Sequence, residues 1–132
     1  MKTRLIDNAV DYPMVEPWWV AHQGVAVPRN VLPPVGVMVE DEDGHPLAAA
    51  WLYLAVGVGV AWMSWSVTNP AMLPQKRVKA LEVVTDALEV LCATHDYGIM
   101  FTETDKPALT RWFKARGFVQ NHTGVTQLFK RV

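Results

Sequence analysis

The sequence is poor in cysteine and in net charge. Its 132 residues include a single cysteine, Cys92, so no disulfide can form within the chain. Lysine and arginine (12) nearly balance aspartate and glutamate (13), and a net charge of −1 gives no general attraction to nucleic acid or to anionic membranes. Hydrophobic residues make up 51% of the chain, too many for a disordered protein. Because no apolar signal segment follows Met1–Arg4, we expect a cytoplasmic globular protein that binds neither nucleic acid nor membrane.

Charged residues are absent from the segment between Leu47 and Val67. About 20 apolar residues can span a bilayer as a helix, so a membrane-associated protein is one alternative. Against it, Gly57 and Gly59 interrupt the middle of the segment, and no lysine or arginine flanks it. The two halves, 47–56 and 60–67, are strand-length and rich in valine and aromatic residues. The pattern therefore predicts an antiparallel hairpin that turns near Gly57.

Hydrophobic periodicity and turn residues predict the other elements. A short strand precedes a helix that Asp11 would cap and that Pro13 and Pro17 would shorten. The strongest helical pattern begins at Pro74 and ends at Tyr97–Gly98. The predicted order is strand, helix, three strands, helix, strand, helix, two strands, which is a single α+β domain with a mixed sheet. The predicted ranges are strands 2–6, 35–40, 47–56, 60–67, 99–102, 118–120 and 125–130, a loop over 24–34, and a late helix capped by Thr104 or Asp105 and closed by Gly117.

The start of the long helix has an unusual charge pattern. Lys76, Arg77 and Lys79 lie in its first turns, with no acidic residue before Glu82. A helix N-terminus carries positive partial charge, so each of these cations is unfavourable there by about 0.3 to 1 kcal/mol. Leu73 cannot cap the helix with its side chain. This combination is typical of an anion-binding helix terminus, although a solvated basic turn would have the same sequence.

Two segments, Gln75–Ala80 at the start of the long helix and Asp105–Phe118 in the late helix, carry recognisable motifs. With these motifs and its element order, the chain resembles the GNAT superfamily of N-acetyltransferases. The segment Gln75–Ala80 (QKRVKA) stands where that family has Gln/Arg-x-x-Gly-x-Gly/Ala around the pyrophosphate of acetyl-coenzyme A. It matches at Gln75 and Ala80 and has Val78 in place of a glycine. The segment Asp105–Phe118 resembles the family's late helix, which ends in aromatic-x-x-x-Gly-Phe. The resemblance covers nearly the whole chain and implies an acyl-CoA-dependent N-acyltransferase with no metal.

The resemblance also implies roles for individual residues. Acetyl-CoA, as co-substrate, would contact the end of the strand over 60–67, the start of the long helix and the late helix. The contact residues would be Trp65, Ser66, Val67, Gln75, Lys76, Arg77, Val78, Lys79, Ala80 and Phe113. The backbone N–H of Val67 would bind the developing oxyanion. Phe113 stands where the family commonly has a tyrosine that protonates the departing thiolate.

The residue that would deprotonate the acceptor amine is left open by the sequence. Glu103 follows the strand over 99–102 and is the first candidate for the base, with Ser66, Glu40 and His22 as weaker ones. The amine itself is unknown, and a homodimer is possible. Because Phe113 and Val78 depart from the family's motifs, a binding or regulatory module without catalysis is the principal alternative.

Other chemical features of the sequence favour structural roles. Cys92 lies on the apolar side of the long helix, where a buried, inert thiol is expected. The four histidines have no metal-ligand spacing. Three tryptophans of the hairpin would pack in a core or dimer interface: Trp51, Trp62 and Trp65. Adjacent residues on a helix point in different directions, so we expect one of Trp18 and Trp19 to line a substrate cleft or a partner surface. The acceptor would enter near these residues and the loop over 24–34.

Overall fold

The computed structural model describes all 132 residues, and the chain divides into two compact units, residues 1–102 and 103–132. The first unit contains a five-stranded sheet in the order β1-β2-β3-β4-β5. Neighbouring strands are antiparallel except β4 and β5, which are parallel. The strands are β1 (Lys2–Leu5), β2 (Val35–Glu40), β3 (Pro46–Leu54), β4 (Val60–Thr68) and β5 (Ile99–Phe101). This arrangement confirms the predicted α+β class with a mixed sheet.

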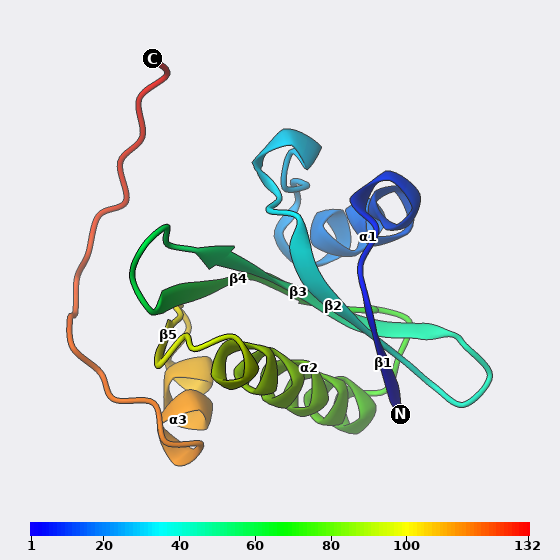
Figure 1. Ribbon diagram of the computed structural model, residues 1–132. Coiled ribbons are helices and arrows are strands. Elements are labelled where there is room, and N and C mark those ends of the chain that lie inside the picture. Colours follow the sequence, from blue (N-terminus) through cyan, green and yellow to red (C-terminus); the bar gives the residue numbers. More distant parts are fainter. The chain divides into compact units, whose positions relative to one another are not determined.

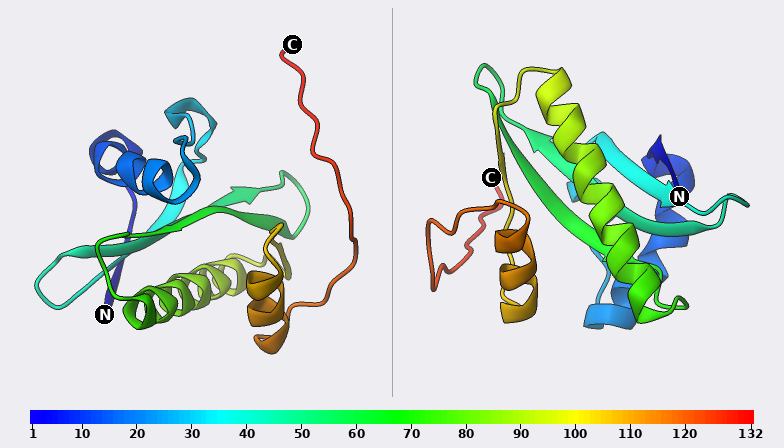
Figure 2. Two further views of the ribbon diagram at one scale, coloured as in Figure 1. Left: turned by 180° about the vertical axis from the view of Figure 1, so that it is seen from behind. Right: turned by 90° about the horizontal axis from the view of Figure 1, so that it is seen from below.

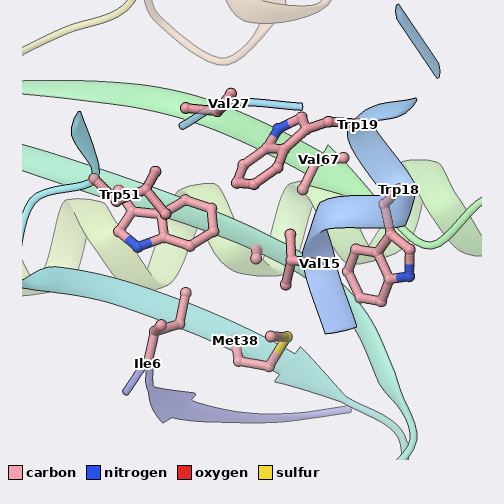
Figure 3. Close-up of a cluster of buried hydrophobic side chains, with 10 residues drawn as sticks. Ile6, Val15, Trp18, Trp19, Val27, Met38, Trp51 and Val67 are labelled. Carbon is pink, nitrogen blue, oxygen red and sulfur yellow. The ribbon is translucent and has the colours of Figure 1, made fainter. Parts of the chain in front are cut away.

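Two helices cover opposite faces of the sheet in this unit (Figures 1 and 2): α1 (Asn8–Gln23) and α2 (Pro74–Thr94). A short 3₁₀ helix, η1 (Arg29–Val31), interrupts the loop between α1 and β2. On the α1 side, Val15 and Trp19 join Met38 and Trp51 of the sheet in one buried cluster (Figure 3). Because helices pack on both faces, β3 is buried on both, and its residues 47–52 are each at most 2% exposed.

The charge-free segment forms β3 and β4, so the hairpin prediction is confirmed. Gly57 lies in the turn between the strands with φ +79°, a backbone conformation that glycine adopts without strain. None of the helices combines the length and apolar character of a membrane span. The alternative of a membrane-spanning helix over 47–67 is therefore wrong.

The start of α1 differs from the prediction. Asp7, and not Asp11, caps the helix by accepting a hydrogen bond from the Ala9 N–H at 3.0 Å. Asp11 is buried and binds the Arg4 guanidinium through both carboxylate oxygens, at 2.8 and 2.9 Å. The helix also continues through Pro13 and Pro17 to residue 23, because the side chains it buries in the core offset the lost backbone hydrogen bonds.

The second unit contains α3 (Pro107–Ala115). The N-cap of this helix and the structure of the residues that follow it both differ from the prediction. Its N-cap position is Lys106, with no side-chain cap, whereas Thr104 Oγ1 accepts from the Lys106 N–H at 3.1 Å before the helix begins. The two strands expected over 118–120 and 125–130 do not form. An isolated two-stranded hairpin is marginally stable, and the residues beyond 118 are exposed and pair with no other strand. The expectation of a single domain over residues 1–132 stays a prediction.

Candidate active site

The central feature of the candidate site is a β-bulge in β4. Ala49 pairs with Val67 and Trp51 pairs with Ser64, so one β3 residue lies opposite two β4 residues, Trp65 and Ser66. Trp65 adopts φ +60°, a left-handed conformation that is uncommon for a bulky residue. The extra residue also changes which face the strand presents, so Val67 packs in the α1-side cluster. The predicted coenzyme contacts over 65–67 therefore coincide with a strained, irregular backbone.

The bulge lies where β4 has a strand on only one side. β5 pairs with β4 from Val60 to Trp62 and no further, while β3 pairs with β4 up to Thr68. Thr102 continues this contact with one side-chain bond, from its Oγ1 to the Met63 carbonyl at 3.1 Å. Beyond that point the β5-side edge of β4 has no strand partner, and backbone groups on such an edge are available to an extended ligand.

The chain runs from the bulge into the N-terminus of α2 through residues 69–73. Leu73 at the N-cap makes no side-chain cap bond, and the first turn contains no acidic residue, as the sequence predicts. The structure limits the number of free donors, however, because the Lys76 and Arg77 N–H groups both donate to the Leu73 carbonyl at 3.0 Å. Pro74 has no N–H, so the Gln75 N–H is the donor left without a protein acceptor.

The side chains of this turn are placed for contact with an external anion. Gln75, Lys76 and Lys79 are exposed and Arg77 is half-buried. Lys79 forms an ion pair with Glu82 at 3.4 Å, a surface contact that stabilises the helix little. Val78, where the family motif has glycine, is 52% exposed, whereas Ala80 is fully buried against the sheet unit's core. The basic side chains thus follow directly after an unsatisfied helix terminus.

His22, at the C-terminal end of α1, contacts β4 one residue after Val67. Its Nε2 lies 2.8 Å from the Thr68 carbonyl oxygen. A carbonyl can only accept, so Nε2 carries the proton in this bond and Nδ1 of the neutral ring has a free lone pair. The ring is exposed, so a ligand can reach it. The structure thereby places one of the weaker predicted base candidates next to the bulge.

The other base candidates have different surroundings. Glu40 forms an ion pair with Arg4 and is occupied structurally. Glu103 belongs to the second unit, where its side chain is exposed and accepts a long bond, 3.4 Å, from Gln127 Nε2. Ser66 lies on the bulge and is exposed. A catalytic role for Glu103 stays a prediction.

Phe113 is a packing residue of the second unit. Its ring is 7% exposed and makes edge contacts with Trp112 and Phe118, at 5.1 and 5.0 Å between ring centroids. A hydroxyl added at this ring would have to find a partner in that packing. The packing of Phe113 is thus explained within its own unit. Its predicted contact with the coenzyme stays a prediction.

The expectation for Trp18 and Trp19 is wrong. Both are buried, at 6% and 3% exposure, and both belong to the α1-side cluster (Figure 3). Trp19 packs on Trp51 with 5.4 Å between centroids. Two adjacent tryptophans enter one core because the cluster extends across β2, β3 and β4 and is wide enough to cover more than one side of the helix.

Sequence reasoning missed a hydrogen-bonded chain that holds the bulge residue. Trp65 Nε1 donates to the Tyr53 hydroxyl at 2.8 Å, and that hydroxyl donates to the Val31 carbonyl of η1. The chain links the bulge to the loop over 24–34. Tryptophan N–H and tyrosine O–H groups usually find a hydrogen-bond partner when they are buried, so the sequence does indicate that Trp65 and Tyr53 have partners. Their identity cannot be predicted, because it depends on the pairing register of β3 and β4.

Cys92 is buried, and burial raises the pKa of its thiol, as expected for an inert core residue. Asp41, Asp43 and His45 cluster in the β2–β3 turn, but Asp41 Oδ1 already accepts the N–H groups of both other residues at 2.9 Å. These bonds are those of an ordinary turn.

Comparison with known proteins places the fold. No family profile matches the sequence, and no curated protein matches it. Solved structures do match over nearly the full chain. An acetyltransferase from Trypanosoma brucei is 10% identical, with 97% of this chain and 99% of that chain covered and a TM-score of 0.68. A candidate acyl-CoA N-acyltransferase from Klebsiella pneumoniae is 16% identical, with 96% and 88% covered and a TM-score of 0.73. Glucosamine-6-phosphate N-acetyltransferase from Arabidopsis thaliana is 8% identical, with 98% of both chains covered and a TM-score of 0.67. At these identities the likeness is one of fold, and the chain therefore shares the fold of these acetyltransferases.

Proposed function

We propose that this chain transfers an acyl group, most simply acetyl, from acyl-coenzyme A to an amine. The observation that carries the proposal is the succession, within one unit, of the strained bulge at Trp65 and the uncapped, cationic N-terminus of α2. The fold likeness supports the same assignment. Each of these two features fits a different part of an acyl-CoA molecule.

The pyrophosphate would bind at the α2 N-terminus. The Gln75 N–H supplies a free donor on the helix axis, and Lys76, Arg77 and Lys79 supply positive charge around it. Charges that are unfavourable beside a helix N-terminus become favourable when a dianionic group lies between them. In this proposal the exposed Val78 side chain points away from the pyrophosphate site and does not occupy it.

The thioester would lie along the open edge of β4. The Val67 N–H, the donor expected from the resemblance, faces β3, because the Asn69 N–H two residues later donates to the Leu47 carbonyl and N–H direction alternates along a strand. The proposed donor to the carbonyl oxygen, whose negative charge grows as the amine attacks, is therefore a backbone N–H of the bulge or of Thr68 that faces the open edge. The amine nitrogen forms a bond to the carbonyl carbon, the carbon–sulfur bond breaks, and the electron pair leaves with sulfur as the thiolate. The proton lost by the amine goes to the base, and the thiolate takes its proton from water, since Phe113 has none to give.

We assign the base to His22 in preference to Glu103. His22 contacts Thr68 directly, in the same unit as the bulge, and its Nε2 bond leaves Nδ1 as a proton acceptor. Glu103 remains the competing candidate.

The alternative function is a binding module without catalysis. The packing of Phe113 between Trp112 and Phe118 favours it, because the position of the family's usual acid is occupied by a core residue. Both functions require coenzyme binding. Release of free thiol in the presence of an amine separates them.

Replacement of Arg77 and Lys79 by alanine tests the coenzyme site. We expect the double variant to bind acetyl-CoA about tenfold more weakly, because two cations that face the pyrophosphate are lost. Its free energy of unfolding should stay the same or rise slightly, since both charges oppose the helix dipole. Isothermal titration calorimetry and urea unfolding measure the two quantities.

Lys130→Ala and Arg131→Ala, two exposed cations of the second unit, form the matched control, which should bind acetyl-CoA as the wild type does. Equal affinity in the Arg77/Lys79 variant would show that these residues form only a solvated basic turn.

A further inference from the structure

An aromatic surface continues from the bulge along the sheet. Trp51 belongs to the α1-side cluster, and Tyr53, two residues further along β3, lies on the same face. Tyr53 pairs with Trp62 of β4, and Trp62 pairs with Phe101 of β5. These three side chains, Tyr53, Trp62 and Phe101, therefore share one face of the sheet and are called here the aromatic platform.

The aromatic platform is ordered and accessible. Trp62 stacks on Phe101 with 5.4 Å between centroids and 18° between the ring planes. The indole is nevertheless 43% exposed, an unusual state for a tryptophan in the middle of a sheet. The stack holds the ring in one orientation while leaving part of it uncovered.

The aromatic platform is continuous with the proposed reaction site. Trp65 of the bulge donates to the Tyr53 hydroxyl at 2.8 Å, so the bulge and the platform share a side-chain contact. Along the sheet, Trp62 lies about 10 Å from Trp65 and about 13 Å from Val67. Val67 pairs with Ala49, four residues before Tyr53 on β3. A ring bound on Trp62 can therefore be joined to an amine at the bulge by an alkyl linker of about four carbons.

The surroundings of the aromatic platform contain little charge. The chain has no Asp, Glu, Lys or Arg between Asp43 and Lys76, nor between Tyr97 and Thr102. The strands β3, β4 and β5 consequently offer no charged side chain to a phosphate, a carboxylate or a second ammonium group. The loop over 24–34, which reaches Tyr53 through the Val31 carbonyl, adds one charged residue, the exposed Arg29.

We infer that the aromatic platform binds the body of the acceptor, and that the acceptor class is a primary amine carrying an uncharged aromatic group on a short alkyl linker. Aromatic contact with the uncovered part of Trp62, which Phe101 holds in place, supplies affinity that does not depend on charge. The inference rests on the proposed function, since it places the amine at the bulge where the thioester would lie.

A pair of amines that differ only in the ring tests this inference. With acetyl-CoA as donor, we expect kcat/KM for thiol release to be about tenfold higher with 4-phenylbutylamine than with butylamine. Glucosamine 6-phosphate, which carries a phosphate and no aromatic ring, should be used no better than butylamine. In Trp62→Ala the preference for the phenyl compound should fall to within about twofold, while Trp62→Phe should retain most of it.

Val90→Ala is the control, because Val90 is 64% exposed and lies on α2, which covers the opposite face of the sheet. It should keep the full preference. Turnover of both alkylamines without a phenyl preference, or a preference that survives in Trp62→Ala, would overturn the inference and leave the proposed function standing. Failure of the wild type to bind acetyl-CoA in calorimetry would overturn the proposed function, and the acceptor assignment with it. A concentration-dependent dimer that Trp62→Ala abolishes would assign the aromatic platform to a second copy of the chain instead.

Discussion

We expect the His22→Gln variant to lose about a hundredfold in kcat/KM for acetyl transfer at neutral pH, the usual contribution of a general base. Glutamine can still donate a hydrogen bond to the Thr68 carbonyl, so the contact between α1 and β4 can be kept, whereas the lone pair of Nδ1 is lost. The measurement is thiol release from acetyl-CoA with a saturating amine. Acetyl-CoA affinity, determined separately by calorimetry, should change by less than about twofold.

Two further variants make this result specific. His95→Gln changes an exposed histidine at the end of α2 and should retain wild-type turnover. Glu103→Gln removes the competing base. A hundredfold loss in Glu103→Gln together with full activity in His22→Gln would show that Glu103 is the base and that the His22–Thr68 contact is structural.

We expect Arg4→Ala to reduce the free energy of unfolding by about 3 kcal/mol at pH 7. The Asp11 side chain is 4% exposed, and Arg4 supplies both of its charged hydrogen bonds. Its remaining protein donor is the Asp7 N–H at 2.9 Å. Removal of one partner of a buried ion pair leaves an uncompensated carboxylate, which is strongly destabilising; we take the lower end of the usual range because Arg4 itself is 40% exposed.

The pH dependence of this effect has a defined sign. The hydrogen bonds from Arg4 hold the pKa of the Asp11 carboxyl below its ordinary value, despite the opposing effect of burial. A lowered pKa in the folded state stabilises the protein above the unfolded-state value of about 3.9, and this stability is lost as the pH falls through the folded-state pKa. The difference between wild type and Arg4→Ala should thus be largest at neutral pH and shrink below about pH 4.

Urea unfolding at pH 7 and pH 3.5 measures both quantities. Lys2→Ala, an exposed residue of the same strand, is the control and should change the stability by less than about 0.5 kcal/mol. Adding Asp11→Asn to Arg4→Ala should recover part of the loss, since the buried charge disappears. A difference between wild type and Arg4→Ala that is the same at both pH values would exclude Asp11 ionisation as its cause.

The features that could be predicted from sequence depend on local patterns. The hairpin of β3 and β4 follows from alternation around Gly57, and α2 follows from its 3.6-residue period and from Pro74. The uncapped helix terminus is also a local property, because Leu73 has no oxygen in its side chain. Each of these predictions needs only residues that are close in the chain.

The features that could not be predicted depend on tertiary context. The bulge at Trp65 is defined by the register of β4 against β3, and periodicity along one strand does not determine register. Aspartate is a residue type that often caps helices, but Asp11 instead forms a buried ion pair with Arg4, seven residues earlier. The contact between His22 and Thr68 joins residues 46 positions apart. The strands expected after residue 117 have the right pattern and lack a neighbouring strand with which to pair.

The central claim is that the bulge and the α2 N-terminus together form an acyl-transfer site, and the most direct test is the time course of free thiol released from acetyl-CoA by the full chain with 4-phenylbutylamine. The claim predicts release that requires both the amine and the protein, that continues over many turnovers, and that yields the N-acetylated amine in equal amount. Absence of release above the uncatalysed rate with this amine and with butylamine, from a preparation that binds acetyl-CoA in calorimetry, would contradict it and favour a coenzyme-binding module.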